Sequence, residues 1–319
     1  MKLIIQIPCF NEEKTLPITI AGLPQKIEGI DKIEVLIVDD GSTDETAKVA
    51  RELGVDYIVQ HTKNRGLAET FMTGLNACLM YGADIIVNTD ADNQYKSEDI
   101  QKLIRPILSG DADLVVGERP IENISHFSFI KKKLQRLGSW VVRHFSGTNI
   151  PDVTSGFRAL SREAALKLNI VSGFTYTLET IIQAGKKNLA ITYVPIRINE
   201  KTRESRLFKN IPHYIKKSVS TIFRIYTMYE PLKVFFALGS LFIGIALLIS
   251  FRFLYFYLMG NGVGHVQSLI FAAILFIIGF QIIVMGWLAD LISMNRRLIE
   301  DQLYKIKKLE ISENGKVEK

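Results

Sequence analysis

Asp84-Ile85-Ile86-Val87-Asn88-Thr89-Asp90-Ala91-Asp92 joins a short apolar run to a pair of aspartates, and this junction decides the fold. A short apolar run that stops at polar residues is typical of a strand buried on both faces of a parallel sheet. Residues 3–7, which stop at Pro8, and residues 34–38, which stop at Asp39-Asp40-Gly41, repeat the pattern. We therefore expect three buried strands, each with polar residues at its carboxyl end.

Helix-length segments separate these strands. Residues 66–81 have the apolar spacing of a helix. Ser42-Thr43-Asp44-Glu45 matches a capping box, so a helix should start there and stop at Gly54. Further strands are expected at residues 57–59 and 114–117. The alternation of strand and helix predicts an α/β fold with a doubly wound, mostly parallel sheet.

Apolar residues gather towards the end of the chain. The chain has 319 residues, of which 48% are hydrophobic, and a mean hydropathy of +0.17. Residues 266–289 carry no charge. A helix of this length would be about 36 Å long, which is enough to cross a hydrocarbon core of about 30 Å. A second apolar run precedes it, so we expect a hairpin of two transmembrane helices, at about 232–258 and 266–290.

The basic residues around this hairpin predict its orientation. The connecting residues 260–265 contain no Lys or Arg, whereas both flanks contain several. Positively charged flanks stay in the cytoplasm. We expect an integral protein of the cell membrane, or of the endoplasmic reticulum membrane in a eukaryote. The α/β domain and both termini should be cytoplasmic.

The segment before the hairpin is basic and amphipathic. Apolar residues at near-helical spacing alternate there with lysine and arginine, which favours a helix in the membrane interface. A helix packed on the α/β domain is the alternative. The predicted division is an α/β domain at 1–206, a juxtamembrane segment at 207–231, transmembrane helices within 232–290 and a tail at 291–319. From about Ser312 we expect the tail to be disordered.

Charge and cysteine content narrow the partners. The net charge of +6 suits anionic partners such as phosphates or acidic lipids, but it is too small to indicate nucleic acid. Two cysteines do not make a disulfide framework and fit a reducing compartment. The five histidines show no metal-ligand spacing.

Asp90 and Asp92 carry the clearest chemical signal. Carboxylates two residues apart on a turn that leaves a strand can converge on one divalent cation, and Gln94 can add an amide oxygen. Such a cation also binds diphosphate oxygens and neutralises a departing nucleoside diphosphate. A polar loop with helix-capping acids is the alternative interpretation.

Five motifs together resemble a known family. They are Pro8-Cys9-Phe10-Asn11-Glu12, Val38-Asp39-Asp40-Gly41-Ser42-Thr43-Asp44, Asp90-Ala91-Asp92-Asn93-Gln94, Val116-Gly117-Glu118-Arg119 and Asp152-Val153-Thr154-Ser155-Gly156-Phe157-Arg158. Over about residues 1–210 the chain resembles the family 2 glycosyltransferases of the GT-A fold. The most similar branch is the polyprenyl-phosphate glycosyltransferases, which include the dolichyl-phosphate mannose synthases.

The resemblance implies a role for each matching position. The expected nucleotide-sugar contacts are Pro8, Phe10, Asn11, Glu12, Val38, Asp40, Ala91 and Arg119. The expected ligands of Mg²⁺ or Mn²⁺ are Asp90, Asp92 and Gln94. The expected catalytic group is Asp90, Asp92, Arg119, Asp152 and Arg158. The expected contacts to the acceptor phosphate are Lys132, Arg136, Arg203, Ser205 and Arg206. Asn93 and Tyr95 stand where mannose synthases often have Leu and His, which speaks against a GDP-mannose donor.

The implied reaction is an inverting transfer of a sugar from a UDP- or GDP-sugar to undecaprenyl or dolichyl phosphate. A lipid phosphate is already an anion, so it needs cationic side chains rather than a strong general base. A homo-oligomer is left open. A processive polysaccharide synthase is disfavoured, because residues 135–140 have the wrong spacing for its Gln-X-X-Arg-Trp motif. Transfer to diacylglycerol or to a lipid-linked oligosaccharide is an alternative, and a non-enzymatic nucleotide-sugar-binding membrane protein is another.

Overall fold

The structure is a computed structural model of the chain. It describes residues 1–120, 129–171, 175–199, 211–260 and 266–317. Within its helices it describes only the backbone of residues 129–137, 211–216, 218 and 314–317. The chain divides into two compact units, an α/β unit formed by Met1–Ile222 with Leu303–Lys319 and a helical unit formed by Phe223–Gln302.

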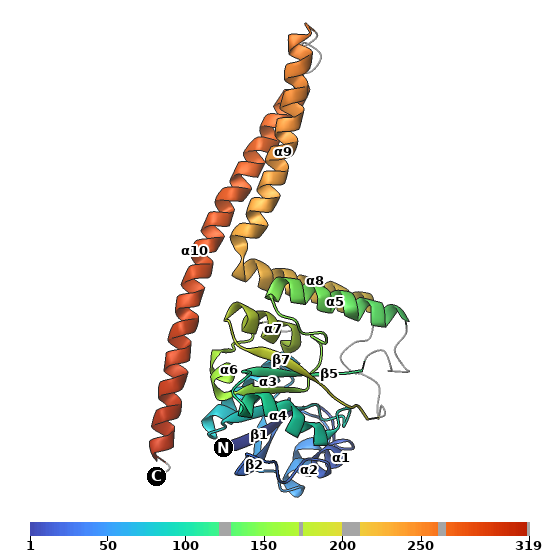
Figure 1. Cartoon of the computed structure of the whole chain (residues 1–319), viewed down its shortest axis with the longest axis vertical. Helices are drawn as coiled ribbons and strands as arrows, with labels where there is room; N and C mark the ends of the chain where they lie inside the picture. Colours follow the sequence, from blue (N-terminus) through green and yellow to red (C-terminus); the bar gives the residue numbers. More distant parts are fainter. Residues whose placement is uncertain (121–128, 172–174, 200–210, 261–265, 318–319) are drawn as a thin grey trace. The chain divides into compact units, whose positions relative to one another are not determined.

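A seven-stranded sheet forms the centre of the α/β unit (Figure 1), and its strand order is β3-β2-β1-β4-β6-β5-β7. The strands are β1 (Lys2–Cys9), β2 (Lys32–Asp39), β3 (Tyr57–Gln60), β4 (Ile85–Asn88), β5 (Leu114–Glu118), β6 (Arg158–Ser161) and β7 (Ile191–Pro195). β1 pairs in parallel with β2 and β4, β2 with β3, and β5 with β7. Among the seven described strands, only β6 runs antiparallel to its neighbours, which are β4 and β5. The predicted mostly parallel α/β sheet is confirmed, and the reversed strand is an addition to it.

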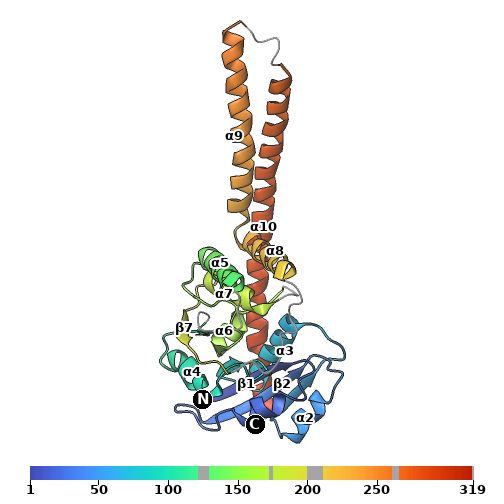
Figure 2. The ribbon, with the colours of Figure 1, turned by 90° about the vertical axis from the view of Figure 1, so that its right-hand side faces the viewer.

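Helices cover both faces of this sheet (Figures 1 and 2). The helices of the α/β unit are α1 (Leu16–Ala21), α2 (Thr46–Glu52), α3 (Leu67–Met80), the 3-10 turn η1 (Ser97–Asp99), α4 (Ile100–Leu108), α5 (Phe129–Ser146), α6 (Arg162–Lys167), α7 (Tyr176–Lys186) and most of α8 (Ile211–Tyr229). Successive residues of β1 point to opposite faces. Leu3, Ile5 and Ile7 therefore join a core with α1, α2 and α4, while Ile4 joins one with α3, α6 and α7.

The predicted capping box before α2 is wrong. The helix begins at Thr46, and its N-cap residue Glu45 makes no side-chain cap bond. The Ser42 hydroxyl instead accepts the backbone N–H of Asn11 (2.9 Å). Asp44 accepts the N–H of Thr46 (3.0 Å) and supplies the missing cap. The tertiary contact to Asn11 therefore replaces the local bond that the sequence pattern suggested.

Among the described residues, two helices are long and apolar enough to cross a membrane, Pro231–Leu258 (α9) and Val266–Glu313 within α10 (Val266–Val317). The predicted spans begin at about 232 and 266, and that these helices cross a membrane stays a prediction. The predicted disordered tail is wrong, because α10 continues as one helix to Val317. Its last turns lack proline and are rich in Leu, Ile, Lys and Glu, which are compatible with a helix.

Glycines bring α9 and α10 together inside the helical unit. A Cβ atom on Gly279 would lie 2.8 Å from the carbonyl oxygen of Gly239, and one on Gly239 would lie 2.7 Å from that of Gly279. No larger side chain fits between backbones at this separation. Close approach through small residues is the usual way in which apolar helices associate in membranes.

We predict that Gly279→Val separates the two helices. Overpacking at a closed contact costs about 1–3 kcal/mol, so the thermal midpoint of the detergent-solubilised protein should fall. Gly244→Val is the matched control, because a Cβ atom at Gly244 meets nothing within 4 Å. Equal midpoints for the two variants would contradict this account of the helix pair.

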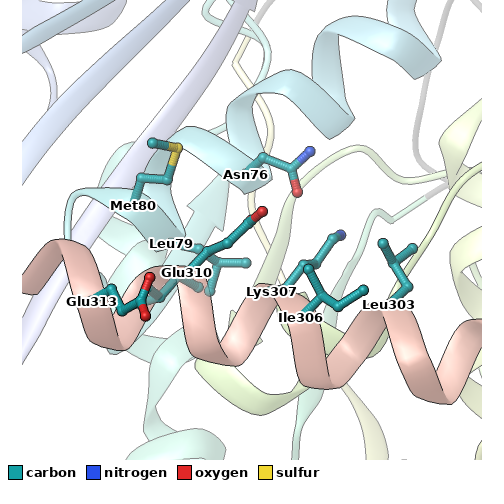
Figure 3. A pocket seen from close by; sticks show the side chains of 9 residues that line it. Asn76, Leu79, Met80, Leu303, Ile306, Lys307, Glu310 and Glu313 are labelled. Carbon is teal, nitrogen blue, oxygen red and sulfur yellow. The ribbon is translucent and has the colours of Figure 1, made fainter.

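The end of α10 belongs to the α/β unit and packs there against α6 and the core on the α3 face. The Tyr304 hydroxyl donates to both carboxylate oxygens of Glu163 in α6 (3.0 and 3.1 Å), and Tyr304 and Ile311 pack against the core on the α3 face. Beside this contact lies a groove of about 530 Å³. In Figure 3, α10 presents Lys307 and Glu310 in this groove, facing residues of α3.

Tyr304→Phe should weaken this attachment. It removes a hydrogen bond to a partly exposed carboxylate, and we expect a loss of about 1 kcal/mol in the free energy of unfolding. The control is Tyr193→Phe, whose side chain is 43% exposed. Denaturant unfolding of both variants measures the difference, and identical stabilities would show that the Tyr304 bond contributes nothing.

Candidate active site

Three of the predicted motifs meet at one edge of the sheet. β1, β2 and β4 are parallel neighbours, so their carboxyl ends lie side by side. The N–H of Asp40 donates to the carbonyl oxygen of Cys9 (2.8 Å), and that of Thr89 donates to Gln6 (3.1 Å). Ligands bind at the carboxyl ends of strands in open α/β sheets. The candidate site therefore lies along this edge.

The first two motifs are bonded directly to each other. Asn11 adopts φ = 57°, a left-handed conformation that asparagine tolerates. This conformation lets its side-chain oxygen accept the N–H of Thr43 (2.8 Å) while its own N–H reaches Ser42. Glu12 is buried, and its N–H donates to the Thr46 hydroxyl (2.8 Å). The loops after β1 and β2 thus form one connected wall.

Asp40 fixes a third loop at this edge. Its carboxylate accepts the backbone N–H groups of Arg65 (2.8 Å) and Gly66 (2.9 Å) and pairs with Nδ1 of His61 (2.8 Å). The other ring nitrogen of His61 lies 3.0 Å from the Thr73 hydroxyl. Asp40 therefore holds the start of α3 in place. Its predicted contact with the nucleotide stays a prediction, and His61 was missed by sequence reasoning.

The aspartate pair follows β4 on a partly exposed turn. Asp92 accepts the N–H of Gln94 (3.1 Å). The carboxylate of Asp90 lies against the backbone of Gly156, where an added Cβ atom would be 3.0 Å from both carboxylate oxygens. Within the described residues, no group of three or more His, Cys, Asp or Glu side chains is arranged to hold a metal.

The donor set at this turn nevertheless fits one kind of metal. Asp90, Asp92 and Gln94 offer only oxygen atoms. Mg²⁺ prefers oxygen ligands, and it is bound by one or two carboxylates together with substrate phosphates rather than by a closed protein cage. The arrangement suits a divalent hard cation that arrives with an anionic substrate.

A buried polar network lies beneath Asp90. The Asn88 amide donates to the carbonyl oxygen of Gly156 (2.8 Å) and to the Tyr176 hydroxyl (2.9 Å), and it accepts from Gln6 (2.9 Å). The N–H of Gly156 donates to the Tyr95 hydroxyl (3.1 Å). Burial, followed by the charge of Asp90, raises the pKa of both tyrosines, which keeps them protonated.

Sequence reasoning missed most of this network. Asn88 offered a signal, because it is a polar residue inside an otherwise apolar strand, and a buried amide needs partners. Tyr95 stood out only as a departure from the mannose-synthase pattern. Tyr176 follows no strand of the predicted sheet and offered no signal.

Arg119, which is partly buried, and the buried Asp152 form an ion pair at the end of β5. The guanidinium donates through Nε (2.7 Å) and Nη2 (3.0 Å) to the two oxygens of Asp152, and through Nη2 to the Thr154 hydroxyl (2.8 Å). Burial alone would raise the pKa of Asp152, but Arg119 outweighs it and holds that pKa below its ordinary value. The two predicted residues are thus brought together by direct contact.

Arg158 has a different environment. It is fully buried, and its guanidinium donates to the carbonyl oxygens of Ser155 (2.8 Å) and Val153 (2.9 Å) and to the Thr180 hydroxyl. Burial lowers the pKa of Arg158 to about 10. These bonds hold residues 152–157 in their course over the sheet edge. A direct catalytic role for Arg158 stays a prediction.

A comparison with known proteins identifies the family. The family model "Glycosyl transferase family 2" matches residues 4–168.

The chain belongs to glycosyl transferase family 2.

Named relatives of this family 2 glycosyltransferase match 60–68% of its chain. The UDP-N-acetylglucosamine–dolichyl-phosphate N-acetylglucosaminyltransferase of Methanococcus voltae is 32% identical over 60% of this chain and 83% of its own. The polyprenol monophosphomannose synthase of Mycolicibacterium smegmatis is 26% identical over 62% of this chain and 77% of its own. The dolichol-phosphate mannosyltransferase of Pyrococcus furiosus is 30% identical over 68% of this chain and 62% of its own.

Solved structures agree with the fold. Glucosyl-3-phosphoglycerate synthase from Mycobacterium tuberculosis, in complex with Mn²⁺, UDP and phosphoglyceric acid, aligns with a TM-score of 0.55 at 18% identity. The alignment covers 71% of this chain and 77% of that structure. The predicted GT-A fold is therefore confirmed for this glycosyltransferase.

The residues predicted to contact the acceptor phosphate are placed only in part. Lys132 and Arg136 belong to α5, of which the structure describes the backbone at these positions. Arg203, Ser205 and Arg206 lie outside the described residues. Their role stays a prediction.

Asp152→Asn should test the ion pair. Removing one charge of a buried pair costs about 3–5 kcal/mol, so we expect a loss of this size at pH 7. A carboxylate with a lowered pKa contributes stability above its unfolded value of 3.8, and the contribution is lost as pH falls through the folded value. The difference from wild type should therefore shrink below about pH 4.

Chemical denaturation at a series of pH values measures this difference. Asp111→Asn is the control, because Asp111 is exposed and its carboxylate accepts a hydrogen bond from the nearby Ser109 hydroxyl rather than from a buried cation. A stability difference that does not change between pH 7 and pH 3 would contradict the assignment to the Asp152 charge.

Proposed function

We propose that this glycosyltransferase moves a sugar from a nucleotide-sugar to a polyprenyl phosphate at the cytoplasmic face of a membrane. The observation that carries the proposal is the turn of Asp90 and Asp92 beside the loops of β1 and β2, in a chain that also has two helices able to cross a membrane. The first feature suits a nucleoside diphosphate, and the second suits a lipid acceptor.

The named relatives support the acceptor class more than the sugar. One of them is named for UDP-N-acetylglucosamine and dolichyl phosphate, another for polyprenol monophosphomannose and a third for dolichol-phosphate mannosyl transfer. These names share a polyprenyl-type lipid, whereas two of them name mannose and one names N-acetylglucosamine. We accordingly propose undecaprenyl or dolichyl phosphate as the acceptor and leave the sugar among glucose, N-acetylglucosamine, galactose and mannose.

Asp90, Asp92 and Gln94 would hold Mg²⁺ or Mn²⁺. When bound there, the cation would neutralise negative charge that builds up on the leaving nucleoside diphosphate. The close approach of the Asp90 carboxylate to Gly156 supports this role, because it restricts the carboxylate on that side.

The protein's own charges would bring the two anions together. Asp152 holds the Arg119 guanidinium in a fixed orientation, and we propose that this guanidinium faces the donor diphosphate. Lys132, Arg136, Arg203 and Arg206 would attract the lipid phosphate, with Ser205 as a hydrogen-bond donor. The phosphate oxygen would attack the anomeric carbon in line with the departing diphosphate, so the configuration inverts.

The membrane would be contacted by three helices. We propose that α9 and the first part of α10 cross the bilayer as a hairpin, with residues 1–206, 207–231 and 291–319 on the cytoplasmic side. On α8, Val219 and Phe223 lie one turn apart and are 60% and 57% exposed, while Lys217 and Arg224 are also exposed. An exposed apolar face with basic neighbours supports an interfacial position for this helix.

Asp90→Asn should abolish transfer while leaving the fold intact. Loss of a group that stabilises transition-state charge typically lowers kcat by about 100- to 1,000-fold. The assay uses the full chain in detergent with Mn²⁺, labelled UDP-glucose, UDP-N-acetylglucosamine, UDP-galactose or GDP-mannose, and undecaprenyl or dolichyl phosphate. Asp111→Asn, which alters an exposed carboxylate before the first residue of β5 and so at the opposite end of that strand from Arg119, should act as wild type.

Two outcomes would count against the proposal. Wild-type turnover in Asp90→Asn would remove the metal role of the turn. Transfer to diacylglycerol or to a lipid-linked oligosaccharide, with none to polyprenyl phosphate, would replace the acceptor.

A further inference from the structure

The turn that carries Asp92 and Gln94 has an unusual backbone. Asn93 adopts φ = 55°, which is in the left-handed region that side chains other than glycine seldom occupy. Such a residue persists where surrounding contacts fix it, and these conformations concentrate at functional sites. The contacts that fix Asn93 come from a segment about a hundred positions further along the chain.

Asn199 makes these contacts. Its side-chain amide donates to the carbonyl oxygen of Asn93 (2.9 Å) and lies 3.4 Å from that of Tyr95. Its backbone N–H donates to the carbonyl oxygen of Gln94 (2.9 Å). One residue thus contacts three consecutive carbonyl groups of the turn.

The segment before Asn199 is itself anchored to the same region. Ile198 forms an isolated antiparallel bridge with Tyr95, and the N–H of Lys96 donates to the carbonyl oxygen of Arg197 (3.3 Å). Arg197 in turn bonds the buried carboxylate of Asp99 through its backbone N–H (2.7 Å) and its guanidinium (2.9 Å). Asn199 is therefore presented to the turn from a fixed position.

The opposite side of the turn is held separately. The Tyr95 hydroxyl is bonded to Gly156 and its ring is stacked on Phe157, 5.0 Å between centroids. Loss of the Asn199 side-chain amide would therefore release the carbonyl group of Asn93, while the backbone bond from Asn199 to Gln94 and the buried side of the turn stay in place.

We infer that Asn199 is a positioning residue for the metal-binding turn: its amide fixes the left-handed Asn93 and thereby the directions of the Asp92 and Gln94 side chains. This inference rests on the proposed metal role of Asp90, Asp92 and Gln94. It also gives a structural reason for Asn93, one of the two departures from the mannose-synthase pattern, since asparagine is among the residues that best tolerate this conformation.

The experiment measures Mn²⁺ binding to the full chain in detergent by electron paramagnetic resonance, without nucleotide and with saturating UDP or, in a second series, GDP. Loss of a group that orients a metal ligand typically lowers metal affinity about 10- to 100-fold, and we expect this for Asn199→Ala. The thermal midpoint of the metal-free protein should stay near that of wild type. Activity should return at high Mn²⁺, because kcat is retained while the apparent KM for Mn²⁺ rises.

Asn188→Ala is the matched control. Asn188 also has a left-handed backbone (φ = 53°), but it follows α7 and lies in a different turn. Its loss should leave Mn²⁺ affinity unchanged. An equal loss of affinity in both variants would overturn the inference, because it would reflect general loosening of the fold.

Asp92→Asn separates the inference from the proposed function. If Asp92→Asn loses Mn²⁺ and Asn199→Ala binds it as wild type does, the positioning role is overturned and the metal site stands. If Asp92→Asn binds Mn²⁺ as wild type does, the proposed metal site itself fails. Should Asn199→Ala fold poorly, Asn199→Ser replaces it under the same criteria, since a serine hydroxyl is too short to contact the carbonyl groups of both Asn93 and Tyr95.

Discussion

The direction of β6 is the constraint on which the candidate site depends. Because β6 runs antiparallel to β4 and β5, its first residue lies at the edge where those two strands end. The segment 152–157, which leads into β6, must therefore cross the carboxyl edge of the sheet. This places Asp152 beside Arg119 and Gly156 against the carboxylate of Asp90. A parallel strand at this position would deliver the same residues to the opposite edge.

Buried polar groups hold that crossing segment in place. Both backbone groups of Gly156 are bonded, its N–H to Tyr95 and its carbonyl oxygen to Asn88. The guanidinium of Arg158 donates to the carbonyl oxygens of Ser155 and Val153 in the same segment. Buried polar groups are costly when unpaired, so each of these bonds restricts the segment to one course. The Asp90 carboxylate at the surface of the site is thus supported from below by buried side chains whose polar groups are all hydrogen-bonded, namely Asn88, Tyr95 and Arg158.

The last helix gives the chain a feature that a simple membrane anchor would lack. α10 contains a run able to cross a membrane and, without a break, a final segment that packs on α6 through Tyr304 and Glu163. The α/β unit is therefore built from two separate parts of the chain, and its last residues contribute to its own core.

Local sequence determined the elements whose signal lies in consecutive residues. The apolar runs of β1, β2 and β4, the acidic turn at Asp90 and the uncharged runs of α9 and α10 all follow from side-chain polarity along a short stretch, because burial of apolar surface and the cost of burying charge act on each stretch by itself. Tertiary structure alone decided that β6 is reversed. It also decided that the Ser42 hydroxyl accepts the N–H of Asn11 instead of capping α2, and that the Asn199 amide donates to the carbonyl oxygen of Asn93. Each of these depends on partners distant in sequence, and a hydrogen bond between distant residues leaves no pattern in the neighbourhood of either one.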